Sequence, residues 1–182
     1  ALPEVVSVRD PDGNELRAIH ASMRGNRDGI YPDTEATELA AQIWPAPRLF
    51  CTAHTHRPFV RSLNGTLVVN SGSAGWAFDG DARASYARLV WQRVGWQAKI
   101  ARVAYDRRRA ALDFAEGGYY QAGGPLTRIM YVEWHEARPL FHTWGARYYP
   151  AVLAGEVSVA TAAESLLREY GLEAVRPPDA DG

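Results

Sequence analysis

The sequence predicts a mixed α/β fold in which strands occupy about the first 105 residues and helices follow them. Two turn dipeptides flanked by β-rich runs, Asp12-Gly13 and Asn64-Gly65, indicate hairpins in the first part. The clearest helical periodicity comes late, over residues 158–170. The chain has 182 residues, of which 47% are hydrophobic and 23% charged, so it is long enough to bury a sizeable core.

The first elements follow from local turn and capping signals. Val5–Arg9 alternates weakly between apolar and polar residues, and residues 16–19 return as a second strand. Residues 25–33 are rich in Gly, Asn and Pro, which is typical of a loop. We expect a helix over residues 34–43 that Thr34 caps and that the following prolines end.

Four further strands are predicted, at residues 48–53, 66–70, 86–92 and 96–103. The second of these is apolar on both faces, as is typical of a strand buried inside a sheet. Gly95 is expected to separate the last two strands.

The pattern becomes helical from Asp106 onward. Ser158 is expected to cap a helix whose apolar residues share one face and which Gly171 ends. The predicted organisation is a domain portion at 1–105, a helical extension packed on the same domain at 106–175, and a tail at 176–182.

Composition and charge exclude several functional classes. The 20 basic and 21 acidic residues give a net charge of −1, so no overall field attracts the chain to nucleic acid or to an anionic membrane. No apolar run approaches the roughly 20 residues of a membrane span. Cys51 is the single cysteine, which excludes an intrachain disulfide and indicates a reducing compartment. The first residues lack a signal-peptide pattern, and we expect a cytoplasmic protein.

Three of the five histidines lie where predicted strands end. His54 and His56 form an Ala-His-Thr-His run after one strand, and His20 ends an earlier one. Side chains at the ends of strands in an α/β sheet face a shared crevice, and neutral imidazole is a common metal ligand. A histidine at a strand end is more often simply hydrogen-bonded, so the pattern alone leaves both readings open. His135 and His142, each flanked by aromatic residues, are interpreted as packing or surface residues.

Four motifs surround these histidines in order: IHAS at 19–22, AHTHRP at 53–58, NSGS at 70–73 and GDARASY at 80–86. This block resembles the C-terminal signature of the calcineurin-like metallophosphoesterases, closest to the small bacterial phosphodiesterase-type branch. The resemblance runs from about residue 4 to residue 105. Ala21 and Ala53 stand where the family usually has glycine, and Ser71 and Ala82 where it usually has proline, which removes no ligand.

The resemblance implies a four-layer αββα sandwich of the metallo-dependent phosphatase type, of which this chain carries the C-terminal part. It implies that His20 and His54 bind one metal of a dinuclear centre and that His56 binds the other. By the same resemblance, Asn70 and Ser73 shape the turn below the site.

The motifs of the family's first half, Asp-x-His, Gly-Asp and Gly-Asn-His-Asp, do not occur here in the family's order. GNRD at 25–28 follows His20 instead of preceding it and has Arg27 in place of the histidine, so we interpret it as a substrate-side loop. Gly80-Asp81 follows the His-x-His run and is interpreted as a turn. We expect the missing portion of the domain, with the catalytic residues and the carboxylate ligands, to lie upstream of Ala1.

The function that the resemblance implies is metal-dependent hydrolysis of phosphodiesters or phosphomonoesters by a metal-bound hydroxide at two divalent ions. Manganese is the family-typical metal, and iron, zinc or nickel also suit such ligands. The expected substrate is a phosphorylated small molecule, a nucleotide or a phosphoprotein. Arg24, Arg27 and Arg83 are candidates to bind its phosphate, against the plainer reading that they are solvated or structural charges.

Two alternatives remain open. Some proteins of this fold have lost catalysis and act as assembly scaffolds, as the retromer subunit does, although three site-directed imidazoles argue against that role. The three histidines alone could instead form a mononuclear zinc site. The aromatic-rich residues 134–149 either cover a sheet or mediate self-association into a homo-oligomer.

Overall fold

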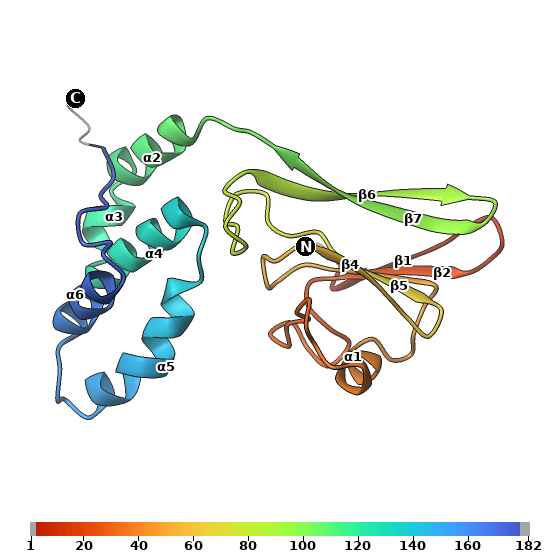
Figure 1. Ribbon diagram of the computed structural model, residues 1–182, viewed down its shortest axis with the longest axis horizontal. Coiled ribbons are helices and arrows are strands. Elements are labelled where there is room, and N and C mark those ends of the chain that lie inside the picture. The colour runs from red at the N-terminus through yellow and green to blue at the C-terminus, as the bar shows by residue number, and fades with distance from the viewer. Residues whose placement is uncertain (1–2, 179–182) are drawn as a thin grey trace. The chain divides into compact units, whose positions relative to one another are not determined.

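The computed structural model describes residues 3–178 and divides the chain into two compact units, one up to Ala104 and one from Tyr105 onward (Figure 1). The first contains all seven described strands and one helix, and the second contains five helices. The mixed α/β class and the change from strands to helices are as predicted. That the helices pack on the strand-containing unit stays a prediction.

A five-stranded mixed sheet forms the centre of the first unit. Its strands are β1 Val5–Arg9, β2 Glu15–Ile19, β3 Leu49–Thr52, β4 Phe59–Leu63 and β5 Thr66–Asn70. Their spatial order is β1-β2-β3-β5-β4, with β2, β3 and β5 mutually parallel and the two edge strands antiparallel to their neighbours. Both predicted hairpins are therefore present. The apolar strand β5 lies inside the sheet, where both of its edges are hydrogen-bonded.

The helix α1, Ala36–Gln42, is shorter than predicted and is capped differently. Thr34 does not cap it, because its hydroxyl accepts a hydrogen bond from the backbone N–H of Tyr31 at 2.9 Å, inside the preceding loop. Glu35 occupies the N-cap position without a side-chain cap. A threonine hydroxyl that satisfies its own turn is not available to the helix that follows.

The core of the first unit lies between α1 and the five-stranded sheet. Ile30, Leu39, Ile43, Phe50 and Val68 form one buried cluster, each at most 1% exposed. Burying such a side chain contributes about 1.5–3 kcal/mol, so this cluster fixes α1 against the sheet.

The strands β6, Ala84–Gln92, and β7, Gly95–Val103, form a separate antiparallel hairpin. Gly95 is not the separator that we expected, since it pairs with Gln92 as the first residue of β7. Figure 1 shows this hairpin on one side of the five-stranded sheet and α1 on the other. The unit thus stacks a helix layer, a sheet layer and a second sheet layer, as in the metallophosphoesterase-type sandwich.

The second unit has its own helical core. Its helices are α2 Arg107–Glu116, α3 Tyr119–Ala122, α4 Pro125–Glu136, α5 Leu140–Leu153 and α6 Val159–Glu169. Ile129, Val132, Trp144, Leu166 and Leu167 are buried together between α4, α5 and α6. As predicted, the Ser158 hydroxyl caps α6 by accepting a hydrogen bond from the Thr161 N–H at 3.0 Å.

No helix within residues 3–178 is long and apolar enough to cross a membrane. Of the predicted tail at 176–182, residues 179–182 lie outside the described residues.

Candidate metal centre

The sheet topology brings the predicted histidines to one edge. His20 directly follows β2, and His54 and His56 follow β3 after one or more loop residues. Because β2 and β3 are parallel neighbours, their carboxyl ends open on the same side of the sheet. Asn70 ends the next parallel strand, β5, at the same edge.

His20 and His54 meet directly. Nε2 of His20 lies 3.0 Å from Nδ1 of His54, and the two rings are edge to face with centroids 4.9 Å apart. This separation suits a hydrogen bond between the nitrogens when no ion is bound. It also suits two ligands of one ion, since metal–nitrogen bonds of about 2.0–2.1 Å at roughly 90–110° place the nitrogens about 2.8–3.4 Å apart.

His56 is oriented by its own contacts. Its Nδ1 donates a hydrogen bond to the backbone carbonyl of Trp76 at 2.5 Å, because a carbonyl oxygen only accepts. Its ring stacks on Phe78 with centroids 4.9 Å apart. The neutral ring therefore carries its proton on Nδ1 and keeps the lone pair on Nε2, which is the usual arrangement of an orientated metal-ligating histidine.

The backbone of the His54-Thr55-His56 turn is strained and tightly held. Both histidines have φ of 55°, a left-handed conformation that non-glycine residues rarely adopt. The fully buried Asn70 amide donates to the Ala53 carbonyl at 2.7 Å and to the Thr55 hydroxyl at 2.9 Å. Its side-chain carbonyl accepts from the Gly72 N–H. These bonds fix the turn in the conformation that presents both rings.

Burial favours the neutral form of the His54 and His56 side chains. Burial, followed by the neighbouring His20, lowers the pKa of His54, while a hydrogen bond to the Arg27 backbone and the Asp28 charge oppose this. Burial also lowers the pKa of His56, against its bond to the Trp76 carbonyl. Neutral imidazole is the form that binds metal.

The donor set within the described residues is incomplete. Over residues 3–178, no group of three or more His, Cys, Asp or Glu side chains is arranged to hold a metal ion. The mononuclear three-histidine zinc site is therefore not formed in this structure. The nearby Asp28 carboxylate is engaged by Ser22 and Arg24. The spacing of the histidine pair fits two ligands of one ion, and a complete metal site would need further donors.

The three arginines differ in their contacts. Arg24 forms ion pairs with Asp28, at 2.9 Å, and with Glu38. Arg83 is paired with Asp81 at 2.6 Å in the turn after Gly80. The exposed Arg27 side chain has no hydrogen bond or ion pair to any residue that the structure describes.

Sequence reasoning missed two positioning features. Gly29 lies so close to the turn that a Cβ atom there would be 2.8 Å from Cγ2 of Thr55 and 3.2 Å from Cδ2 of His54. The carbonyl that orients His56 belongs to Trp76, 20 residues further along the chain. No local pattern marks either residue, because each acts through a contact that only the folded chain creates.

Two solved structures with TM-scores above 0.5 agree with the fold. A metallophosphoesterase from Sphaerobacter thermophilus matches at a TM-score of 0.51 and 25% identity, over 65% of this chain and 54% of that one. A hypothetical protein from Pyrococcus horikoshii matches at 0.53 and 22%, over 62% and 45%. Vps29 from Cryptosporidium parvum matches at 0.36 and 20%, over 57% and 58%. No protein-family model and no curated protein matches.

The chain thus spans about half the length of the first two structures that it matches. Over that span, it has the fold of the calcineurin-like metallophosphoesterases.

Proposed function

We propose that this chain, with its calcineurin-like metallophosphoesterase fold, supplies the histidine ligands of a metal-dependent phosphoester hydrolase. The observation that carries the proposal is the 3.0 Å approach of the His20 and His54 nitrogens at the carboxyl ends of two parallel strands. The similarity to the Sphaerobacter thermophilus metallophosphoesterase supports it at the level of the superfamily.

Each histidine has a distinct role in the proposal. His20 and His54 would hold one divalent ion, and His56 would use its Nε2 for a second, because its Nδ1 donates to the Trp76 carbonyl. When bound, such ions polarise the phosphoryl oxygens and lower the pKa of water. A complete two-ion centre would also need carboxylate ligands, which would come from outside the described residues. Manganese is the metal that we expect.

Arg27 is the best candidate for binding the substrate phosphate. Its side chain is exposed and unpaired among the described residues, whereas Arg24 and Arg83 already hold carboxylates. Its backbone contacts His54, which puts the loop beside the proposed centre. A guanidinium donates in a planar fork that suits phosphate oxygens. The substrate is a phosphodiester or phosphomonoester of a small molecule, nucleotide or protein.

A non-catalytic scaffold is the second candidate function. The observation that favours it is the absence, within residues 3–178, of three metal-ligating side chains in one group. A scaffold requires no metal, so metal binding separates the two functions.

The test is a calorimetric Mn²⁺ titration of the intact protein, with turnover of bis(p-nitrophenyl) phosphate and p-nitrophenyl phosphate. We expect His20→Ala and His54→Ala each to weaken Mn²⁺ binding at least about tenfold and to abolish turnover, because each removes a ligand. Arg27→Met is expected mainly to raise KM. His142→Ala, which changes an exposed histidine in α5, is the matched control and retains both properties. Mn²⁺ binding that is equally strong in His54→Ala contradicts the proposed centre.

A further inference from the structure

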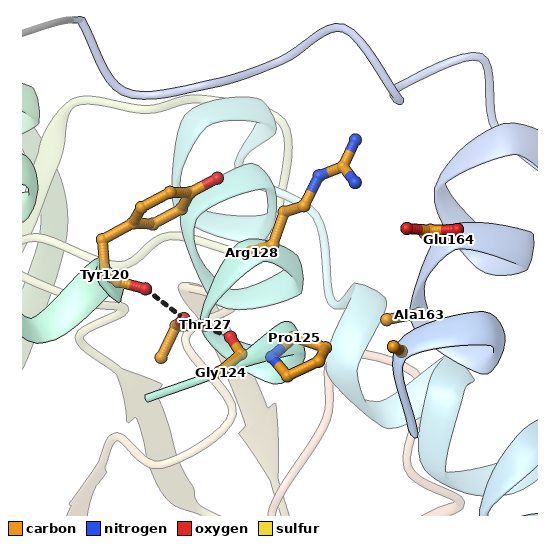
Figure 2. A pocket seen from close by; sticks show the side chains of 8 residues that line it. Tyr120, Gly124, Pro125, Thr127, Arg128, Ala163 and Glu164 are labelled. Carbon is orange, nitrogen blue, oxygen red and sulfur yellow. Dashed lines mark hydrogen bonds between the residues drawn. The ribbon is translucent and has the colours of Figure 1, made fainter. Parts of the chain in front are cut away.

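The helical unit contains a cavity of about 250 Å³ that the proposed hydrolase function does not use. It lies between α4 and α6, with Tyr120 of α3 at one end, and we call it the α4–α6 cavity (Figure 2). Typical pockets for drug-sized ligands measure roughly 300–1,000 Å³, so this cavity, which is smaller than that range, suits only a ligand of a few heavy atoms.

The first wall of the cavity presents a cation with unused donors. Arg128 extends from α4, and one of its terminal nitrogens donates to the backbone carbonyl of Glu173. Its Nε–H is buried and has no hydrogen-bond partner. Protein atoms cover this nitrogen, so the donor that a ligand in the cavity can reach is the other terminal nitrogen, which makes no hydrogen bond to a described residue.

The opposite wall presents an anion. Glu164 projects from α6, and Figure 2 shows its carboxylate facing Arg128 across the opening. Within the part of the chain that the structure describes, neither side chain forms an ion pair. Two unlike charges therefore face one cavity without neutralising each other.

Apart from Tyr120 and Thr127, the rest of the lining is small and apolar. Pro125, Ala160 and Ala163 present only hydrocarbon side chains. The Thr127 hydroxyl donates to the carbonyls of Tyr120 and Gly124 and so offers no further donor proton to a ligand. The charged groups of Arg128 and Glu164, with the Tyr120 phenol, are the side-chain groups that can select a polar ligand, and the apolar residues leave room for a short hydrocarbon group.

We propose that the α4–α6 cavity binds a free α-amino acid with a small apolar side chain. Its carboxylate accepts hydrogen bonds from Arg128, and its ammonium group donates to Glu164. A simple anion is repelled by Glu164 and a simple cation by Arg128, so the charge pair selects a molecule that carries both charges. Valine has the required groups and a short branched side chain for the Pro125 and Ala163 surface.

The test is an NMR titration of the intact chain with L-valine, following the Arg128 Nε–H signal and the amides of Gly124 and Ala163. We expect saturable shifts at these three positions. N-acetylvaline lacks the ammonium group and valinamide lacks the carboxylate. Each is expected to bind at least about tenfold more weakly, because it leaves one protein charge without its partner.

A variant of Glu164 tests whether valine binds at this cavity. Glu164→Gln is expected to weaken valine binding at least about tenfold. It leaves the fold intact, because the exposed Glu164 side chain makes no hydrogen bond within residues 3–178. Glu156→Gln, at another exposed glutamate, is the matched control and binds as the unchanged chain does. Equal binding of the three probes, no saturable shift with valine, or unchanged affinity in Glu164→Gln overturns the proposal.

Discussion

At the scale of single residues, Asp28 links the loop before α1 to the candidate metal centre. Its carboxylate accepts hydrogen bonds from the Ser22 hydroxyl and from Nε of Arg24, at 2.5 and 2.9 Å. Its charge also acts on His54. The hydrogen bond from Arg24 is the main cause that lowers the pKa of Asp28 from 3.8 to about 2. Ionised Asp28 therefore stabilises the folded loop.

This shift predicts a pH-dependent contribution to stability. A carboxyl whose pKa is lower in the folded state contributes fully above pH 3.8, and its contribution is lost as pH falls through the window from 3.8 to about 2. Asp28→Asn is expected to lower the free energy of unfolding at neutral pH by about 1 kcal/mol, after allowance for solvent screening. Urea unfolding measured across this pH range should show a smaller acid loss in the variant.

Asp33→Asn is the control for this prediction, because Asp33 is exposed in the same loop and has no hydrogen bond to a described residue. A stability curve of Asp28→Asn that falls with acid as steeply as that of the unchanged chain contradicts the role of the Arg24 contact.

Sequence motifs single out the candidate site residues, but they do not reveal the groups that position these residues. His20, His54, His56 and Asn70 stand in short motifs with fixed spacing, so a local pattern was enough to single them out. The Trp76 carbonyl was not predictable, because backbone groups leave no mark in the sequence. The pairing of His20 with His54 depends on which strands become neighbours, and residue spacing alone does not determine that.

At the scale of elements, the end of β5 fixes the conformation of the His54-Thr55-His56 turn. Asn70 is the last residue of β5, and its side chain crosses to the Ala53 carbonyl and the Thr55 hydroxyl. The left-handed conformations of His54 and His56 persist because this strand end holds the turn.

Asn70→Ala tests whether the Asn70 side chain holds this turn in place. The variant leaves the Gly72 N–H without its acceptor and removes the donor to the Ala53 carbonyl and the Thr55 hydroxyl, so we expect the free energy of unfolding to fall by about 1–3 kcal/mol. Hydrogen exchange of amides 53–57 should become faster. Asn26→Ala, at an exposed position of the neighbouring loop, serves as the control. Equal stability and equal exchange in the two variants are incompatible with a locking role.

Helix caps show how far element boundaries are predictable. Ser158 precedes a strong apolar periodicity and its hydroxyl is used only at the start of α6, so the prediction there is confirmed. Thr34 also precedes a predicted helix as a capping residue, but its hydroxyl accepts a hydrogen bond from the Tyr31 N–H in the preceding turn. Capping signals fail where a preceding loop competes for the same group.

At the scale of the whole molecule, the described chain has two separate hydrophobic cores. One cluster draws on residues 19–68 and the other on residues 126–175, so no described residue belongs to both. The mixed class and the position of the change were predictable from the periodicity. The strand order β1-β2-β3-β5-β4 was not, because it depends on long-range pairing.

Two cores predict two separable unfolding transitions. Leu39 and Leu166 are both fully buried, one in each cluster, so Leu39→Ala and Leu166→Ala delete the same atoms from different cores. Each is expected to lower the stability of its own unit by about 2–5 kcal/mol and to leave the other unit unchanged. Hydrogen exchange followed by mass spectrometry along a urea series separates the units. A variant that shifts both units by the same amount shows that they unfold together.

The parallel pairing of β2 with β3 has one further consequence. Successive side chains of a strand alternate between faces, so sliding β2 by a single position against β3 would turn His20 away from His54. An ion that binds both nitrogens would therefore favour the correct register over one that is shifted by a single residue. Metal binding at this edge of the sheet would then stabilise the native strand register during folding.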